Sequence, residues 1–239
     1  MNRTGTLYLI PAPLGEAPLT GFLPDDVRQI ANRIDHWIVE HPKTARQILK
    51  RYGPERQMSE LAMRELNEHT RAQDLAPLLE PLLAGHDVGL MSEAGCPGIA
   101  DPGADLVRLA HRHGIRVAPL VGPSSILLAL MAAGASGQRF RFHGYLPVDA
   151  GPRLERLREL ERDSARFDEA QLFIETPYRN DAMVDAVLQA CRDSTWLTVA
   201  RDLACPEELV LSRPLTDWKK LERPLLKKRP AMFVLYAGR

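Results

Sequence analysis

Residues 6–40, which read TLYLIPAPLGEAPLTGFLPDDVRQIANRIDHWIVE, decide the fold. Thr6–Ile10 and His36–Glu40 are short apolar runs of the kind that forms buried strands. Between them, Leu23–Ile34 repeats its apolar residues at helical spacing and carries two acidic residues in its first turn. A strand, a helix and a strand in this order form the βαβ unit of a parallel sheet. The sequence therefore predicts an α/β fold.

The same alternation continues through the first half of the chain. Three further strands are predicted near Met58–Met63 and at Asp87–Ser92 and Ile115–Leu120, and three helices at Pro42–Tyr52, Leu75–Ala84 and Ala104–His113. Together with the first two strands, these make a full open sheet. We expect residues 1–120 to form an N-terminal α/β domain with a parallel sheet.

A second set of elements follows in residues 121–239, which we expect to form a C-terminal α/β domain. Helices are predicted at Ser125–Ala133, Pro152–Arg166, Asp181–Cys191 and around Trp218, and strands at Phe140–Leu146, Gln171–Glu175, Trp196–Arg201, Glu208–Ser212 and Ala231–Tyr236. Because only a short helix separates the last three strands, this sheet should be mixed. No linker separates the halves, so we expect a ligand cleft between the two domains.

Composition excludes several classes of protein. Hydrophobic residues make up 45% of the 239 residues and charged residues 26%, which is ordinary for a packed globular protein and excludes disorder. The 31 basic residues balance the 31 acidic ones. No global field therefore draws the chain to nucleic acid, and an RNA partner would need a local basic patch.

Cysteine usage and apolar runs indicate a cytoplasmic protein. The three cysteines lie far apart without C-x-x-C spacing, which favours neither disulfides nor a metal site. The sequence starts without the pattern of a signal peptide, and no apolar run reaches the length of a membrane span. We therefore expect no membrane association and no bound metal.

Three loops rich in glycine and proline follow predicted strands, where open α/β sheets bind their ligands. They are Pro11–Gly15, Ser92–Gly103 and Val121–Ser125. Glycine allows close approach of the backbone to a ligand, and proline fixes the loop in advance. None of the loops matches the P-loop or the G-x-G-x-x-G dinucleotide pattern. Each alone could be an ordinary turn, but three in register favour a binding site.

Four segments carry a family resemblance: GTLYLIPAPLG at 5–15, SEAGCPGIADPG at 92–103, GPSS at 122–125 and FHGYLP at 142–147. They resemble the tetrapyrrole methylase superfamily of S-adenosylmethionine-dependent methyltransferases, which has two α/β/α domains. The branch that is most similar is the bacterial 16S rRNA ribose-2′-O methyltransferases. IETPYR at 174–179 and ARDL at 200–203 resemble two further segments of the family.

The resemblance implies a cofactor, S-adenosylmethionine, bound in the cleft between the domains. Glu93 stands where the family usually has aspartate, and it could instead cap its loop. The positions that match the family's cofactor contacts are Leu14, Glu93, Cys96, Ser125, Ile126, Phe173 or Ile174, Leu203, and Ala231 or Met232.

A ribose hydroxyl must lose a proton when it accepts a methyl group, so a base is expected. The candidate bases or orienting groups, each near the end of a predicted strand, are Glu40, Glu68, His69 and Glu175. Glu40 and Glu175 have an equally good structural interpretation, in which they pair with Arg46 and Arg179. The branch has Glu-Asp-Thr-Arg-His-Thr where this chain has EHPKTAR at 40–46, so only the glutamate is kept in register.

The resemblance also implies rRNA or the small ribosomal subunit as partner, and a homodimer. A basic cluster that could contact phosphates contains Lys219, Lys220, Lys227, Lys228 and Arg229, with Arg179 and Arg201 as further candidates. Two alternatives remain open at this point. One is a methyltransferase that acts on a small tetrapyrrole-like acceptor, and the other is a non-catalytic protein that binds S-adenosylmethionine.

Overall fold

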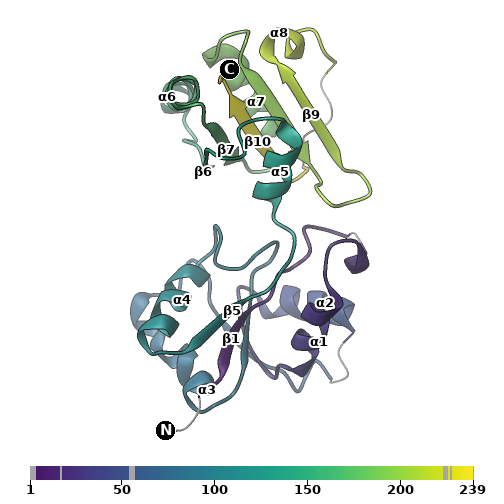
Figure 1. The fold of residues 1–239 in the computed structure, drawn as a ribbon, viewed down its shortest axis with the longest axis vertical. Coiled ribbons are helices and arrows are strands. Elements are labelled where there is room, and N and C mark those ends of the chain that lie inside the picture. Colours follow the sequence, from purple (N-terminus) through teal and green to yellow (C-terminus); the bar gives the residue numbers. More distant parts are fainter. Residues whose placement is uncertain (1–3, 17, 54–56, 223–225, 227, 239) are drawn as a thin grey trace. The chain divides into compact units, whose positions relative to one another are not determined.

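The computed structural model describes residues 4–16, 18–53, 57–222, 226 and 228–238. The chain divides into two compact units, Met1–Ser124 (unit 1) and Ser125–Arg239 (unit 2). Each unit has its own five-stranded sheet. Figure 1 shows helices beside the strands in each unit. The predicted α/β class, with a parallel first sheet and a mixed second sheet, is confirmed.

Unit 1 contains a parallel sheet with strand order β3-β2-β4-β1-β5. Its strands are β1 (Thr6–Leu9), β2 (His36–Val39), β3 (Ala62–Glu65), β4 (Val88–Met91) and β5 (Arg116–Pro119). Its helices are η1 (Leu19–Gly21), α1 (Asp25–Arg33), α2 (Pro42–Tyr52), η2 (Ala72–Asp74), η3 (Ala76–Leu79), α3 (Glu80–Leu83) and α4 (Gly103–Arg112).

Two predictions for unit 1 need adjustment. The third strand begins at Ala62, a few residues later than expected. The predicted helix at Leu75–Ala84 is split into the 3-10 turn η3 and the short helix α3. Pro77 and Pro81 explain the split, because neither has a backbone N–H to donate to the preceding turn.

Helices cover both faces of the unit 1 sheet. On one face, Trp37 and Met91 form a buried cluster with residues of α1 and α2. On the other face, Leu7, Ile38 and Leu90 pack with residues of η3, α3 and α4. Figure 1 shows α1 and α2 on one side of β1 and α4 on the other. Alternate residues of each strand therefore face different helices, as expected for a doubly covered parallel sheet.

The chain leaves β2 and β4 in opposite directions along the sheet. After β2 it passes through α2 to β3 at the edge, whereas after β4 it passes through α4 to β5 at the opposite edge. Because α2 and α4 cover opposite faces, the loops that follow β2 and β4 diverge. A crevice outside the carboxyl ends of two such strands is where open α/β sheets bind ligands.

Unit 2 contains a mixed sheet with strand order β6-β7-β10-β8-β9, in which only β6 and β7 are parallel. Its strands are β6 (Phe140–Tyr145), β7 (Ala170–Ile174), β8 (Trp196–Arg201), β9 (Leu209–Pro214) and β10 (Ala231–Tyr236). Its helices are α5 (Ser125–Ala133), α6 (Ala150–Phe167), α7 (Asn180–Ala190) and α8 (Leu215–Trp218).

The unit 2 sheet also has two covered faces. On one, Phe173 stacks on Phe233 with ring centroids 5.4 Å apart, inside a core shared with α6 and α7. On the other, Thr198 donates to Ser212, whose hydroxyl donates to the carbonyl of Ala133 at the end of α5. No described helix combines the length and the apolar character that a membrane span requires.

Candidate functional site

The three predicted loops meet at the carboxyl edge of the unit 1 sheet, where β4, β1 and β5 are neighbours. Ala12 and Gly95 exchange two backbone hydrogen bonds, with N–O distances of 2.8 and 3.1 Å, which join the first loop to the second. The Cys96 thiol donates to the carbonyl of Pro123 at 3.3 Å, which joins the second loop to the third. The loops therefore form one connected main-chain surface.

Gly122 allows the first and third loops to pack closely. A Cβ atom at this position would lie 2.1 Å from Cβ of Pro11, far inside van der Waals contact. Pro11 is itself held by the buried hydroxyl of Tyr52, which donates to its carbonyl. Any side chain at residue 122 would therefore push the two loops apart.

The second loop is folded in advance by Asp101. This carboxylate accepts hydrogen bonds from the N–H of Gly98, at 2.9 and 2.8 Å, and from the N–H of Gly103 at 2.7 Å. Burial raises the pKa of Asp101, and the backbone N–H groups of Gly103, Gly98 and Ile99 partly oppose that shift. These hydrogen bonds tie both ends of the segment from Gly98 to Gly103 to one side chain.

Glu40 spans the crevice between β2 and β4. Its Oε1 accepts from the N–H of Glu93 at 3.1 Å, and the neighbouring His41 places Nδ1 3.1 Å from Oε1 of Glu93. Burial raises the pKa of Glu40; the hydrogen bond from Glu93 opposes the shift, and the negative charges of Asp101 and Glu93 add to it. No ion pair joins Glu40 to Arg46 among the described residues, so the predicted alternative pairing does not form.

Glu68 and His69 follow β3 at the same edge of the sheet, but their side chains face solvent. Each side chain is 86% exposed, and Nε2 of His69 lies 3.7 Å from Oε1 of Glu68. The N–H of His69 donates to the side chain of Asn67 at 3.0 Å, which forms a local turn. Within the described chain, no hydrogen bond connects either side chain to Glu40 or Glu93.

The predicted cofactor contacts in the strands of unit 2 lie on two different faces of its sheet. Ile174 and Met232 are register partners on the face that α5 covers, the helix that begins with Ser125 and Ile126. Phe173 and Ala231 point the other way, into the α6 and α7 core. Their side chains are thus buried away from α5, because residues next to each other in a strand face opposite sides. Leu203 is buried in the turn after β8.

Glu175 is buried and engaged, which corrects its interpretation as a base. Its side chain is 0% exposed, and Oε1 accepts from Arg179 at 2.7 and 3.0 Å and from the N–H of Thr176 at 2.6 Å. The structural alternative, pairing with Arg179, is the one that forms. A base must reach the proton that it removes, and this carboxylate has no exposed surface.

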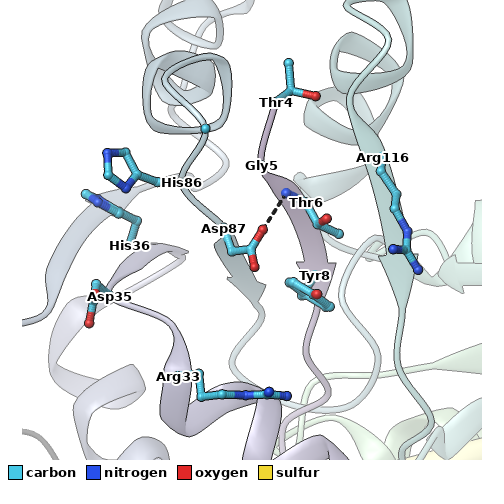
Figure 2. A pocket seen from close by; sticks show the side chains of 11 residues that line it. Thr4, Gly5, Thr6, Tyr8, Arg33, Asp35, His36, His86, Asp87 and Arg116 are labelled. Carbon is cyan, nitrogen blue, oxygen red and sulfur yellow. Dashed lines mark hydrogen bonds between the residues drawn. The ribbon is translucent and has the colours of Figure 1, made fainter. Parts of the chain in front are cut away.

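Sequence reasoning missed a polar pocket at the amino edge of the unit 1 sheet, drawn in Figure 2. Its volume is about 540 Å³, and Asp87 accepts from the N–H of Thr6 at 2.7 Å beside it. The cationic side chains around it are Arg33 and Arg116, with His36 and His86 nearby. Burial lowers the pKa of His36, and the charges of His86 and Arg64 add to that effect. This pocket and the loops lie at opposite ends of the strands.

The fold and the loop surface define an α/β protein with three connected loops at the carboxyl ends of parallel strands, followed by a second α/β unit. A family model described as tetrapyrrole (corrin/porphyrin) methylases matches residues 6–218. The chain belongs to the tetrapyrrole methylase family and is a methyltransferase. The resemblance stated from the sequence is confirmed.

Individual proteins agree with this assignment. Ribosomal RNA small subunit methyltransferase I of Xylella fastidiosa is 32% identical over 215 residues, which cover 90% of this chain and 74% of that protein. The protein of the same name from Mesorhizobium japonicum is 34% identical over 200 residues, 82% of this chain and 63% of its own length.

Solved structures share the fold at low identity. The crystal structure of the methyltransferase CobJ matches 98% of this chain and 93% of its own, with a TM-score of 0.63 and 18% identity. Cobalt precorrin-4 methyltransferase, CbiF, matches 97% of this chain and 94% of its own, with a TM-score of 0.61 and 15% identity.

Proposed function

We propose that this protein transfers the methyl group of S-adenosylmethionine to a ribose 2′-hydroxyl of small-subunit rRNA. The observation that carries the proposal is the similarity, over 90% of the chain, to proteins named for rRNA methylation. A small tetrapyrrole-like acceptor is less favoured, because cobalt precorrin-4 methyltransferase, which is named for such an acceptor, shares only the fold at 15% identity. The proposed substrate implies a cytoplasmic protein, and we keep the homodimer as an expectation.

The carboxyl edge of unit 1 fits the cofactor. The connected loops offer backbone groups and the apolar side chain of Leu14, with Cys96 beside them. The carboxylates of Glu40, Glu93 and Asp101 surround the start of the second loop, and their negative charge suits a cationic sulfonium and ammonium ligand. When bound, S-adenosylmethionine supplies an already activated methyl group. The protein's part is then alignment and deprotonation.

Glu40 is the carboxylate best suited to take the proton of the acceptor hydroxyl. It lies at the ligand crevice, is partly exposed, and binds the second loop through Oε1 only. Its raised pKa makes it a better proton acceptor than an ordinary exposed carboxylate. Glu68 and His69 have no comparable contact with the loops among the described residues, so they rank below it.

The test combines calorimetry and ribose mapping. Titration with S-adenosylmethionine should show saturable binding, and incubation with labelled cofactor and small ribosomal subunits should label a ribose in the rRNA. Labelling of rRNA that carries no new 2′-O-methyl group would contradict the acceptor, and absence of cofactor binding would contradict the whole proposal. Turnover with a tetrapyrrole and none with RNA would favour the second candidate.

Gly122→Ala tests the loop surface. We expect the affinity for S-adenosylmethionine to fall at least about tenfold, because the added Cβ would force the first and third loops apart. Calorimetry measures the loss. The control is Gly21→Ala in the same unit, where an added Cβ meets no atom within 4 Å. Equal affinities for the two variants would mean that the cofactor does not depend on the packing of these loops.

A further inference from the structure

Three arginines gather at one end of the unit 2 sheet, beside the start of α7. Arg179 directly precedes α7, and Arg201 ends β8, where it is the register partner of Ala231 at the start of β10. Arg229 lies two residues before β10, and its carbonyl accepts from the side chain of Asn180 at 2.7 Å. Segments far apart in sequence thus bring three arginine residues to the same end of the sheet.

Two buried carboxylates hold these arginines. Glu175 fixes Arg179 through two hydrogen bonds to one oxygen. Asp202 contacts both Arg201, at 2.5 Å, and Arg229, at 3.5 Å, through its Oδ2. Three arginines against two carboxylates leave the cluster one positive charge in excess. Guanidinium groups that are already held lose less conformational freedom on binding an anion.

The cluster has hydrogen-bonding capacity that the described residues do not use. Nε of Arg201 and Oε2 of Glu175 are buried and have no partner there. Buried polar atoms are normally paired, and the unused N–H of Arg201 lies beside partly exposed guanidinium groups. The start of α7 also lacks a side-chain cap, and the positive end of its dipole favours an anion.

An exposed aromatic ring adjoins the cluster. Tyr178 directly precedes Arg179 in the chain, and its side chain is 70% exposed. Arginines that bind phosphates and aromatic rings that stack on bases are the two components by which proteins hold single-stranded RNA. A purely structural ion-pair network would require no exposed ring at this position.

We propose that Arg179, Arg201 and Arg229 bind phosphates of the RNA substrate and that Tyr178 stacks on an adjacent base. This inference rests on the proposed function and names the RNA-contacting residues for it. Glu175 and Asp202 are positioning residues, which hold the guanidinium groups in place. Of the predicted lysine cluster, Lys219 forms an ion pair with Asp193, and Lys227 lies outside the described residues.

The test compares binding of full-length 16S rRNA transcript across four proteins at several salt concentrations. Arg229→Gln and Tyr178→Ala probe the cluster at its most exposed side chains, where folding is least at risk. Arg213→Gln is the charge control, because Arg213 pairs with Leu197 at the opposite end of the β8–β9 ladder from Arg201. Calorimetry with S-adenosylmethionine monitors the integrity of each protein.

We expect Tyr178→Ala to weaken binding about 5- to 100-fold with little change in salt dependence, as for loss of one stacked base. Arg229→Gln should weaken it less and reduce the slope of log K against log salt by about 1. In methylation assays both should raise KM for RNA more than they lower kcat. If both variants bind RNA with the affinity and salt slope of the parental protein, the proposed RNA contacts are wrong. An equal loss of affinity in Arg213→Gln would also contradict these contacts, but neither result would contradict the proposed function. A parental protein that neither binds nor methylates rRNA would overturn the proposed function and this inference with it.

Discussion

Glu40→Gln is expected to lower the rate of methyl transfer about 10²- to 10⁴-fold, the range typical for loss of a general base. The amide keeps an oxygen that can accept from the N–H of Glu93, so the second loop should hold its position. Affinity for S-adenosylmethionine should therefore change little. Single-turnover rates with saturating cofactor and RNA measure the effect on the chemical step.

The pH dependence of the rate shows whether Glu40 acts as a base or only positions the second loop. Because burial raises the pKa of Glu40, the parental rate should fall as the pH drops through that raised pKa, where the carboxylate becomes protonated and can no longer accept a proton. In Glu40→Gln this acidic limb should vanish. Glu60→Gln, at an exposed carboxylate before β3, should keep both the rate and the limb. A parental rate in Glu40→Gln would assign the side chain to loop positioning only.

Element types were predictable from the sequence because apolar periodicity directly reflects which faces are buried. The predicted spans Pro42–Tyr52, Ser125–Ala133, Trp196–Arg201 and Ala231–Tyr236 match the structure residue for residue. The split of Leu75–Ala84 arises from its two prolines, whose local effect outweighs the helical spacing of the leucines. The loops at strand ends were recognisable because glycine and proline constrain the backbone directly, so their positions in the sequence indicate turns.

The burial and contacts of individual side chains were less predictable, because they depend on which face of a strand a helix covers. Phe173 and Ile174 are equivalent in a sequence pattern, yet only Ile174 faces α5. Glu175 has the sequence position of a strand-end carboxylate, yet it is buried and bonded to Arg179, the residue before α7. The pocket in Figure 2 has a weak signal in hindsight, since Thr6 and Arg116 are register partners and polar on the same face of the sheet.

Trp37→Ala is expected to lower the free energy of unfolding of unit 1 by about 3–5 kcal/mol, the usual loss when a buried tryptophan is truncated. The side chain is 1% exposed, and its Nε1 donates to the carbonyl of Ile34 at 3.0 Å. The ring crosses Gly89 of β4, where a Cβ would lie 2.6 Å from the indole. Gly89 has no side chain to fill that space, so truncation leaves a cavity between the sheet and its helices.

Hydrogen exchange at the amides of β2 and β4 measures this loss within unit 1. Trp196→Ala is the matched control, because Trp196 is 46% exposed at the start of β8, and surface truncations change stability by under about 1 kcal/mol. Exchange in β2 and β4 should accelerate strongly in Trp37→Ala and stay parental in Trp196→Ala.

The truncation should also affect the candidate site, because Glu40 and the second loop directly follow β2 and β4. Loss of the indole loosens the packing of both strands against α1 and α2, so we expect cofactor affinity to fall with stability in this variant. Unchanged exchange at these amides would show that the helices collapse onto the sheet and that the glycine opposite the ring serves another purpose.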